Sequence, residues 1–160
     1  MRFLGNIEAR TDTKGRAFLP SAFRKVLLPS GEEGLVLRQD IFEKCLVIYP
    51  ESVWNREMDE MRARLSRWDR RQQMVYRSFV SGVINLAVDG NGRILIPKNF
   101  LEAAGIKQAI RFVGMGDTIE VWANETGGEP FMNSDEFGLA LEQLMAPKSD
   151  DTHKPTSTNE

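Results

Sequence analysis

Short strand-like runs occupy both halves of the chain, and a longer helical pattern separates them. In each half an extended segment (residues 7–11 and 84–88) is followed by a short apolar run (residues 17–19 and 94–96). Runs rich in β-branched and aromatic residues come next, which is typical of strands. These later runs are residues 35–37, 45–49, 109–113 and 119–122. The pattern predicts two β-rich modules with the same order of elements.

The middle of the chain has the spacing of helices. Apolar residues recur there at intervals of four and three, which places them on one face of a helix. This stripe consists of Trp54, Met58, Met61, Leu65 and Trp68. We expect a second helix to begin at Ser66 or Asp69 and to run through Gln72, Val75 and Phe79.

Arginines crowd the other faces of these two expected helices. They are Arg62, Arg64, Arg67, Arg70, Arg71 and Arg77. In one interpretation the apolar stripe packs on the modules and the arginines are merely solvated. In the other, the stripe forms a subunit interface, and some arginines reach neighbouring acidic residues or DNA. Both interpretations stay open at this point.

The two β-rich modules contain an internal repeat. Residues 5–23 and 82–100 align at an offset of 77 residues and share seven of nineteen positions. Unrelated segments of this length would share roughly one, given residue frequencies of a few per cent each. The shared positions are Gly5/Gly82, Ile7/Ile84, Asp12/Asp89, Gly15/Gly92, Arg16/Arg93, Pro20/Pro97 and Phe23/Phe100. A duplicated unit is therefore the feature that the fold has to accommodate.

At the centre of each copy lies an Asp-x-x-Gly-Arg sequence with the chemistry of a tight turn. An aspartate can accept a hydrogen bond from the backbone two residues further on, and a glycine adopts positive φ without strain. Pro20 and Pro97 suit the first position of a helix, because no amide donor is needed there. We expect a short helix after each proline, and Gly105 as the C-terminal stop of the second.

The size of the modules predicts how they pack. Each spans about 45 residues, and a domain this small rarely buries an adequate core unless a metal, disulfides or a partner supports it. The residues offer neither a metal site nor a disulfide, so we expect the two copies to pack together. A pseudo-two-fold pairing within the chain is the simplest arrangement. It would place both Gly-Arg turns on one edge of the molecule.

Charge is distributed unevenly along the 160 residues, whose formal net charge is −2. Residues 1–124 contain 19 Lys and Arg against 15 acidic residues, whereas from Glu125 onward there are eight acidic residues and two lysines. The modules can therefore present a basic surface although the whole chain is mildly acidic. We predict an amphipathic helix within residues 125–146, with Ser134 as its N-cap, and a disordered tail from residue 147 to 160.

The composition argues against several classes of protein. Cys45, the one cysteine, excludes an intrachain disulfide, is typical of a reducing cytosol, and is expected to be a buried hydrophobe. The one histidine, His153, lies in the tail, so His-based catalysis and a His/Cys metal site are not expected. We predict no enzymatic activity, no cofactor and no small-molecule substrate. Neither a membrane span nor a signal peptide is expected, because no long apolar run occurs.

The arginines of the two turns favour nucleic-acid binding instead. Arg16 and Arg93 each follow a glycine, so each guanidinium would project from a hairpin tip. There its planar fork can grip a phosphate or read O6 and N7 of guanine. Arg10 and Lys14 would add contacts to phosphates.

An alternative role for each arginine is structural. Either arginine could pair with the aspartate four residues earlier, Asp12 or Asp89, and only brace the turn; both roles can hold at once. The second copy has Asn91 at the position of Lys14, and Ala87 at that of Arg10, so the first module is expected to contribute more electrostatic affinity. A tip with two or three cations binds DNA weakly, and many tips presented together would supply the affinity.

These features resemble the MraZ family. The resemblance rests on the signature from Asp12 to Pro20, its second copy at residues 89–97 and the run 45–50, and it covers roughly residues 1–145. It implies two swapped-hairpin modules of the SpoVT/AbrB type, in ring-like homo-oligomers that bind short repeated sites on double-stranded DNA upstream of the division and cell-wall gene cluster. The positions that match the family's DNA-binding motif are Asp12, Arg16, Asp89 and Arg93, with Lys14 matching in the first copy only.

We therefore predict an α+β fold with a mainly β core: two tandem, pseudo-symmetric swapped-hairpin modules forming a small barrel, with a helical insert and a C-terminal helix. The expected divisions are residues 1–50, 51–81, 82–124, 125–146 and 147–160. The predicted function is that of a cytoplasmic, nucleoid-associated transcriptional regulator. The main alternative is an interaction module of the same fold that acts through protein partners or RNA.

Overall fold

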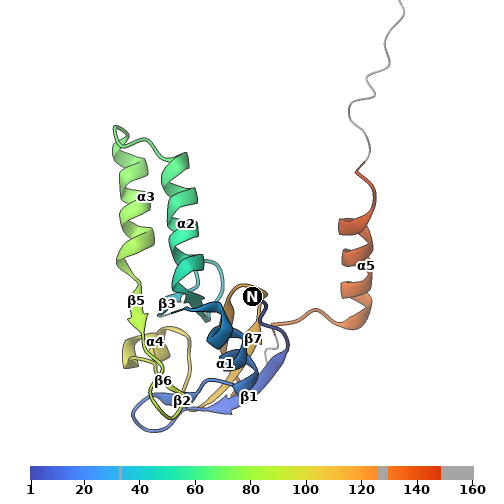
Figure 1. Ribbon diagram of the computed structural model, residues 1–160. Helices are drawn as coiled ribbons and strands as arrows, with labels where there is room; N and C mark the ends of the chain where they lie inside the picture. Colours follow the sequence, from blue (N-terminus) through green and yellow to red (C-terminus); the bar gives the residue numbers. More distant parts are fainter. Residues whose placement is uncertain (33, 126–129, 149–160) are drawn as a thin grey trace, which may run out of the picture. The chain divides into compact units, whose positions relative to one another are not determined.

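A computed structural model describes residues 1–32, 34–125 and 130–148 of the chain (Figure 1). The chain divides into two compact units, Met1–Gly128 and Glu129–Glu160, which are described separately below. Among the described residues, no helix combines the length and the apolar content that crossing a membrane requires. His153 lies outside the described part, which ends at residue 148. The same holds for the predicted tail apart from residues 147 and 148.

The first unit is built on a six-stranded antiparallel sheet with the order β1-β7-β8-β4-β3-β5. Three strands come from each half of the chain, and the order is palindromic in the repeat, because β5 corresponds to β1, β3 to β7 and β4 to β8. The strands are β1 (Asn6–Arg10), β7 (Ala109–Gly114), β8 (Ile119–Ala123), β4 (Leu46–Pro50), β3 (Leu35–Gln39) and β5 (Ile84–Leu86).

The outer strands are exchanged between the two halves. Strand β1 of the first half pairs with β7 of the second, opposing Ile7 to Phe112. Strand β5 of the second half pairs with β3 of the first, opposing Ile84, the repeat partner of Ile7, to Leu37. At the centre of the sheet β4 pairs with β8, which joins the group β1-β7-β8 to the group β4-β3-β5. This exchange confirms the swapped, pseudo-symmetric pairing that the resemblance implies.

The remaining strands form a separate two-stranded ribbon, β2 (Arg16–Phe18) with β6 (Arg93–Leu95). Its centre is the pair Ala17 and Ile94, which occupy equivalent positions in the repeat, so the pseudo-two-fold axis passes between them. Two reciprocal hydrogen bonds flank the ribbon: Leu19 N–H donates to Gly92 O at 2.9 Å, and Ile96 N–H to Gly15 O at 2.9 Å. Each turn is thus tied to the strand that follows the other turn.

The six-stranded sheet is open rather than closed into the small barrel that was expected. Among the described residues β1 and β5 each pair on one side only and form the two edges. The reason lies in the turns. Each edge strand leads directly into an Asp-x-x-Gly-Arg turn, which carries the chain out of the sheet into the β2/β6 ribbon, at the bottom of Figure 1. The ribbon covers one end of the sheet without bridging its edges.

The core lies between the sheet, the ribbon and two short helices, α1 (Ser21–Leu27) and α4 (Lys98–Ala103), and a 3-10 turn, Leu28–Ser30, continues α1. Both halves contribute buried side chains to one cluster, as a pseudo-symmetric pairing requires. Pro20 and Pro97 are the N-cap residues, one position before the helical position predicted for them, because their ψ angles of 137° and 150° are extended. Gly105, at φ +67°, ends α4 as expected.

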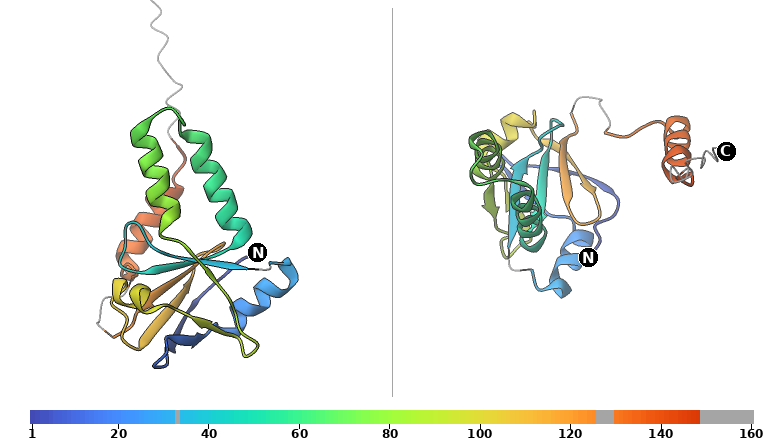
Figure 2. Two further views of the ribbon diagram at one scale, coloured as in Figure 1. Left: turned by 90° about the vertical axis from the view of Figure 1, so that its left-hand side faces the viewer. Right: turned by 90° about the horizontal axis from the view of Figure 1, so that it is seen from above.

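A helical arm, formed by α2 (Glu51–Arg64) and α3 (Arg70–Ser81), extends away from the sheet (Figures 1 and 2). At its base Trp54 stacks on Phe79 with a centroid separation of 5.0 Å. The second helix begins after Asp69, whose side chain accepts a hydrogen bond from Gln72 N–H at 3.0 Å. The prediction that Trp68 continues the apolar stripe is wrong: α2 ends at Arg64, and Trp68 is 98% exposed in the turn of the arm.

The second unit contains one helix, α5 (Ser134–Met145), in its described residues. The N-cap is Asn133 rather than Ser134, because the Asn133 side chain accepts a hydrogen bond from Glu136 N–H at 2.9 Å. None of the residues of α5 is buried, although the helix is amphipathic.

Candidate nucleic-acid interface

The first turn is held together by one carboxylate. Asp12 Oδ1 accepts hydrogen bonds from the N–H groups of Lys14 and Arg16, both at 2.9 Å, and Oδ2 accepts one from Arg16 Nε at 2.7 Å. Gly15 completes the turn at φ +86°, with its N–H donating to Asp12 O at 3.0 Å. The residue types that the sequence repeats are thus the ones that make these hydrogen bonds.

The second turn has the same set of hydrogen bonds. Asp89 Oδ1 accepts from the N–H groups of Asn91 and Arg93, both at 2.9 Å, and Oδ2 accepts from Arg93 Nε at 3.0 Å. Gly92 has φ +82°, close to the value in the first turn. The bracing of each arginine by its aspartate, one of the two roles expected from the sequence, is therefore present in both copies.

The hydrogen bonds favour the ionised form of both carboxylates. The backbone N–H of Arg16 is the largest cause that lowers the pKa of Asp12 below its ordinary value, and the arginine side chain lowers it further. The N–H and side chain of Arg93 lower the pKa of Asp89 in the same way. Each aspartate accepts from the arginine side chain through Nε only. No described residue accepts a hydrogen bond from the Nη atoms of either arginine. Those donors remain available to a ligand.

The ribbon places the two arginines on one outward face. Arg16 opposes Leu95, and Arg93 opposes Phe18, so the arginines are diagonal neighbours, about 7–8 Å apart at Cα. Their side chains are 35% and 26% exposed, whereas Ala17 between them is buried. The sequence prediction required both arginines on one edge of the molecule, and the ribbon meets that requirement.

Two apolar side chains share this face with the arginines. Phe18 is 60% exposed and Leu95 is 54% exposed. From the sequence each was counted within an apolar run, and neither was singled out. The signal that could have found them is alternation: their neighbours Ala17, Leu19, Ile94 and Ile96 are all buried, so the middle residue of each run faces outward.

The other predicted cations differ in position. Lys14 is exposed in the first turn, beside Arg16. Arg10, the last residue of β1, donates through Nη2 to Gln108 Oε1 at 3.1 Å and so is partly engaged at the edge of the sheet. Among the described residues Lys14 is thus unengaged beside Arg16, whereas Arg10 is held by a partner on the neighbouring strand region.

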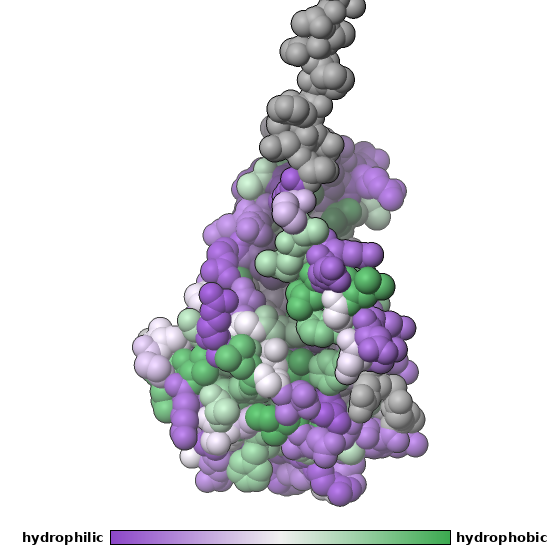
Figure 3. Space-filling model, turned by 90° about the vertical axis from the view of Figure 1, so that its right-hand side faces the viewer, coloured by the Kyte–Doolittle hydropathy of each residue, from purple (hydrophilic) through white to green (hydrophobic). Residues whose placement is uncertain are grey.

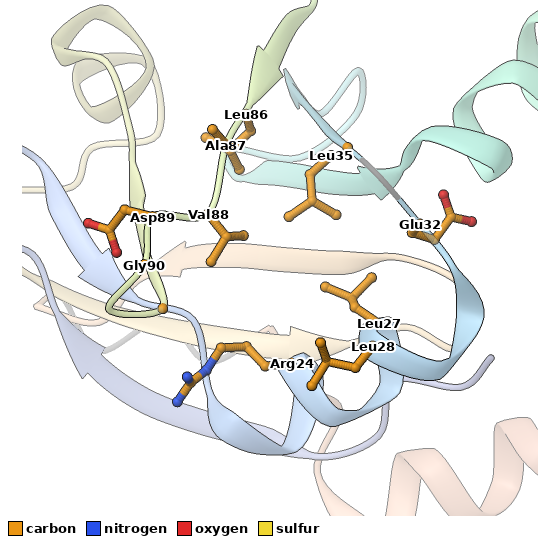
Figure 4. A pocket seen from close by; sticks show the side chains of 12 residues that line it. Arg24, Leu27, Leu28, Glu32, Leu35, Leu86, Ala87, Val88, Asp89 and Gly90 are labelled. Carbon is orange, nitrogen blue, oxygen red and sulfur yellow. The ribbon is translucent and has the colours of Figure 1, made fainter.

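Arg24 is a further cation beside the second turn, and it was not identified from the sequence. Its Nε donates to Leu19 O at 3.0 Å, and a Cβ at Gly92 would lie 2.5 Å from its Nη1. Figure 4 shows the Arg24 side chain, which comes from α1, extending along a pocket of about 430 Å³ whose opposite wall includes Val88 and Asp89. Leu101 occupies the equivalent position in the repeat, so no duplicated cation marked the site.

The described residues offer little for other chemistry. They contain no group of three or more His, Cys, Asp or Glu side chains that could hold a metal ion. Burial raises the pKa of the Cys45 thiol well above its usual range, which disfavours a nucleophilic role.

Comparison with known proteins finds one matching family and relatives that this chain matches over most of their length. The family model described as "MraZ protein, putative antitoxin-like" matches residues 2–78 and 79–126. A protein of Phocaeicola vulgatus named "Transcriptional regulator MraZ" is 53% identical over 145 residues, 91% of this chain and 94% of its own length. Proteins of the same name from Bacteroides thetaiotaomicron (52% over 145 residues; 91% and 93%) and Stenotrophomonas maltophilia (34% over 124 residues; 77% and 83%) are also similar.

Proposed function

The chain belongs to the MraZ family, and we propose that it regulates transcription by binding double-stranded DNA through its two Asp-x-x-Gly-Arg turns. The observation that carries the proposal is the outward face of the β2/β6 ribbon, where Arg16 and Arg93 are diagonal neighbours. Each guanidinium is fixed through Nε and keeps its Nη donors unengaged by the described residues. The names of the similar proteins, which call them transcriptional regulators, agree with this role.

Each residue of the face has a part in the proposed contact. Arg16 and Arg93 present a planar fork that fits O6 and N7 of guanine in the major groove, or a phosphate. Asp12 and Asp89 position these forks by holding Nε, so that less conformational freedom is lost on binding. Phe18 and Leu95, exposed beside them, are suited to contact thymine methyl groups.

Additional cations would bind phosphates and set the register on the duplex. Lys14 serves the first turn, Arg24 serves the second, and Arg10 lies further along the edge of β1. Arg24 offsets the missing charge at Asn91, because it reaches the second turn from the first half of the chain. The two turns would then carry similar numbers of cations despite their different sequences.

The face of one chain is too small for tight binding, so the proposal includes a homo-oligomer, a ring in the family resemblance. Several ribbons on one assembly would engage tandem promoter sites of the division and cell-wall gene cluster with high avidity and without new contacts. In this proposal the protein acts in the cytoplasm on the nucleoid, has no enzymatic activity and needs no cofactor.

A salt titration of DNA binding tests the proposal. The full chain is titrated into a labelled duplex from the region upstream of its own gene, at salt concentrations from about 50 to 200 mM. Each phosphate contact contributes about −0.9 to the slope of log K against log salt, so the five cations named above predict about −4.5 if all of them contact phosphates. Excess duplex RNA of the same sequence should not compete. Absence of binding, or equal binding to RNA or to a scrambled duplex, would contradict the proposal.

A further inference from the structure

The helical arm carries a groove that no described part of the first unit fills. The groove has a volume of about 520 Å³ and lies along the face of α3 and the side of α2. We call it the arm groove; it is lined by Arg38, Ile41, Met61, Arg71, Met74, Val75, Ser78 and Phe79. Ile41, Met74 and Val75 are exposed although they are large and apolar. Exposed apolar residues gathered in one groove are typical of an interaction site.

The floor of the arm groove contains a buried cation with an unused donor. Arg38 is buried, and its guanidinium carbon lies 4.5 Å from the ring centroid of Phe79. Its Nη1 has no hydrogen-bond partner among the described residues. A buried donor without a partner costs free energy, and the Arg38 guanidinium adds positive charge to the floor of the groove.

The charge around the groove selects the kind of segment that would fit. Two arginines, Arg38 and Arg71, line the groove, and no described acidic residue does. An occupant should therefore combine an apolar stripe with acidic flanks. The arm points away from the β2/β6 ribbon in Figures 1 and 2, so its arginines do not belong to the face proposed to bind DNA.

Helix α5 has these properties. Its apolar stripe comprises Phe137, Leu141 and Leu144, spaced i, i+4 and i+7, all exposed. The charged residues of the helix are Asp135, Glu136 and Glu142, with no lysine or arginine among its twelve residues. An isolated helix of this length is marginal in water, so α5 needs a surface to pack against. Figure 3 colours one face of the molecule by hydropathy. On that face, exposed hydrophobic side chains lie between hydrophilic ones.

We propose that α5 of one copy of the chain docks into the arm groove of a second copy. The stripe would fill the apolar part of the groove, and Glu136, on the flank of the stripe, would meet Arg71. Every copy has one donor helix and one acceptor groove, so the contact is head-to-tail and repeats from copy to copy until a ring closes. The inference rests on the proposed function in one respect, because it supplies the homo-oligomer on which avidity for DNA depends.

Matched substitutions on both surfaces test the contact. Leu141→Glu places a charge in the apolar stripe of α5, and Leu139→Glu places the same charge on the opposite side of the helix. Val75→Glu blocks the groove, and Arg77→Gln changes the net charge equally at a residue that does not line it. Native mass spectrometry of the full chain should show loss of the oligomer for Leu141→Glu and Val75→Glu, and wild-type mass for the two controls. Circular dichroism should be unchanged in all four, since these residues are exposed or half-exposed.

Mixing the two disruptive variants identifies the copy that provides the helix. The Val75→Glu chain keeps an intact α5 and the Leu141→Glu chain keeps an intact groove, so an equimolar mixture should form a one-to-one heterodimer. If α5 occupied the groove of its own chain, mixing would change nothing, and the proposal would be overturned. Wild-type mass for either disruptive variant would overturn it as well. These masses are measured without DNA, so they fail or succeed independently of the salt titration above.

Discussion

The two Asp-x-x-Gly-Arg turns have the same internal hydrogen bonds and different surroundings. In both, one aspartate accepts from two backbone N–H groups and one arginine Nε. Outside the turns the closest contacts differ: a Cβ at Gly15 would lie nearest the carbonyl oxygen of Ile96, whereas a Cβ at Gly92 would lie nearest the side chain of Arg24. Local sequence therefore dictates the shape of each turn, and the rest of the chain dictates how much change that turn tolerates.

The largest effect expected from this difference is on stability. Alanine at either glycine is strained by the positive φ, which costs about 1–2 kcal/mol. At Gly15 the new Cβ would also lie 2.4 Å from the carbonyl oxygen of Ile96, and such overpacking against backbone adds about 1–3 kcal/mol. At Gly92 the new atom meets the end of the Arg24 side chain, which can move. Gly15→Ala should therefore lower the free energy of unfolding by about 2–5 kcal/mol, and Gly92→Ala by about 1–2 kcal/mol.

Urea unfolding of both variants, followed by circular dichroism, measures this asymmetry. The wild-type m-value should be retained, so that the shift in midpoint reports stability. Equal losses of stability at the two positions would show that the backbone contact of Gly15 does not distinguish the turns.

A smaller effect is expected on the salt dependence of DNA binding. The second turn lacks the lysine of the first, so Lys14→Ala removes this local difference by taking a charge from the first turn, and Asn91→Lys removes it by adding a charge to the second. If Lys14 contacts a phosphate, its removal should make the slope of log K against log salt shallower by about 0.9, and the added lysine should make it steeper by a similar amount. Lys148→Ala, which removes the same charge outside the turns, serves as the control. An unchanged slope for Lys14→Ala would exclude this lysine from the interface.

The duplicated turn was predictable because all of its determinants are local. Asp12, Gly15 and Arg16 lie within five residues and recur unchanged at the second copy, and the hydrogen bonds that shape the turn join residues 12–16 only. Gly105 was predictable as a helix stop for the same reason. The exchange of edge strands came from the family resemblance, because the partner of β1 lies about a hundred residues away along the chain.

The features that sequence reasoning missed depend on distant contacts or on where one element ends. Arg24 belongs to the second turn only because α1 crosses to it, and nothing in the repeat marks that position. Trp68 continued the helical spacing, but Leu65 has extended backbone angles, so the stripe stops with α2. Phe18 was counted with its apolar neighbours, whereas the pleat of the ribbon turns it outward.

The central claim is that the two turns form one DNA-binding surface, and the affinities of Arg16→Ala and Arg93→Ala test it most directly. Each variant should bind the promoter duplex more weakly by about 1–3 kcal/mol, roughly 5- to 150-fold, with an unchanged circular dichroism spectrum. Weaker binding is expected for both variants, because the arginines are neighbours on one face of the ribbon. Wild-type affinity for either variant, at matched salt, would contradict the claim that the turns share one surface.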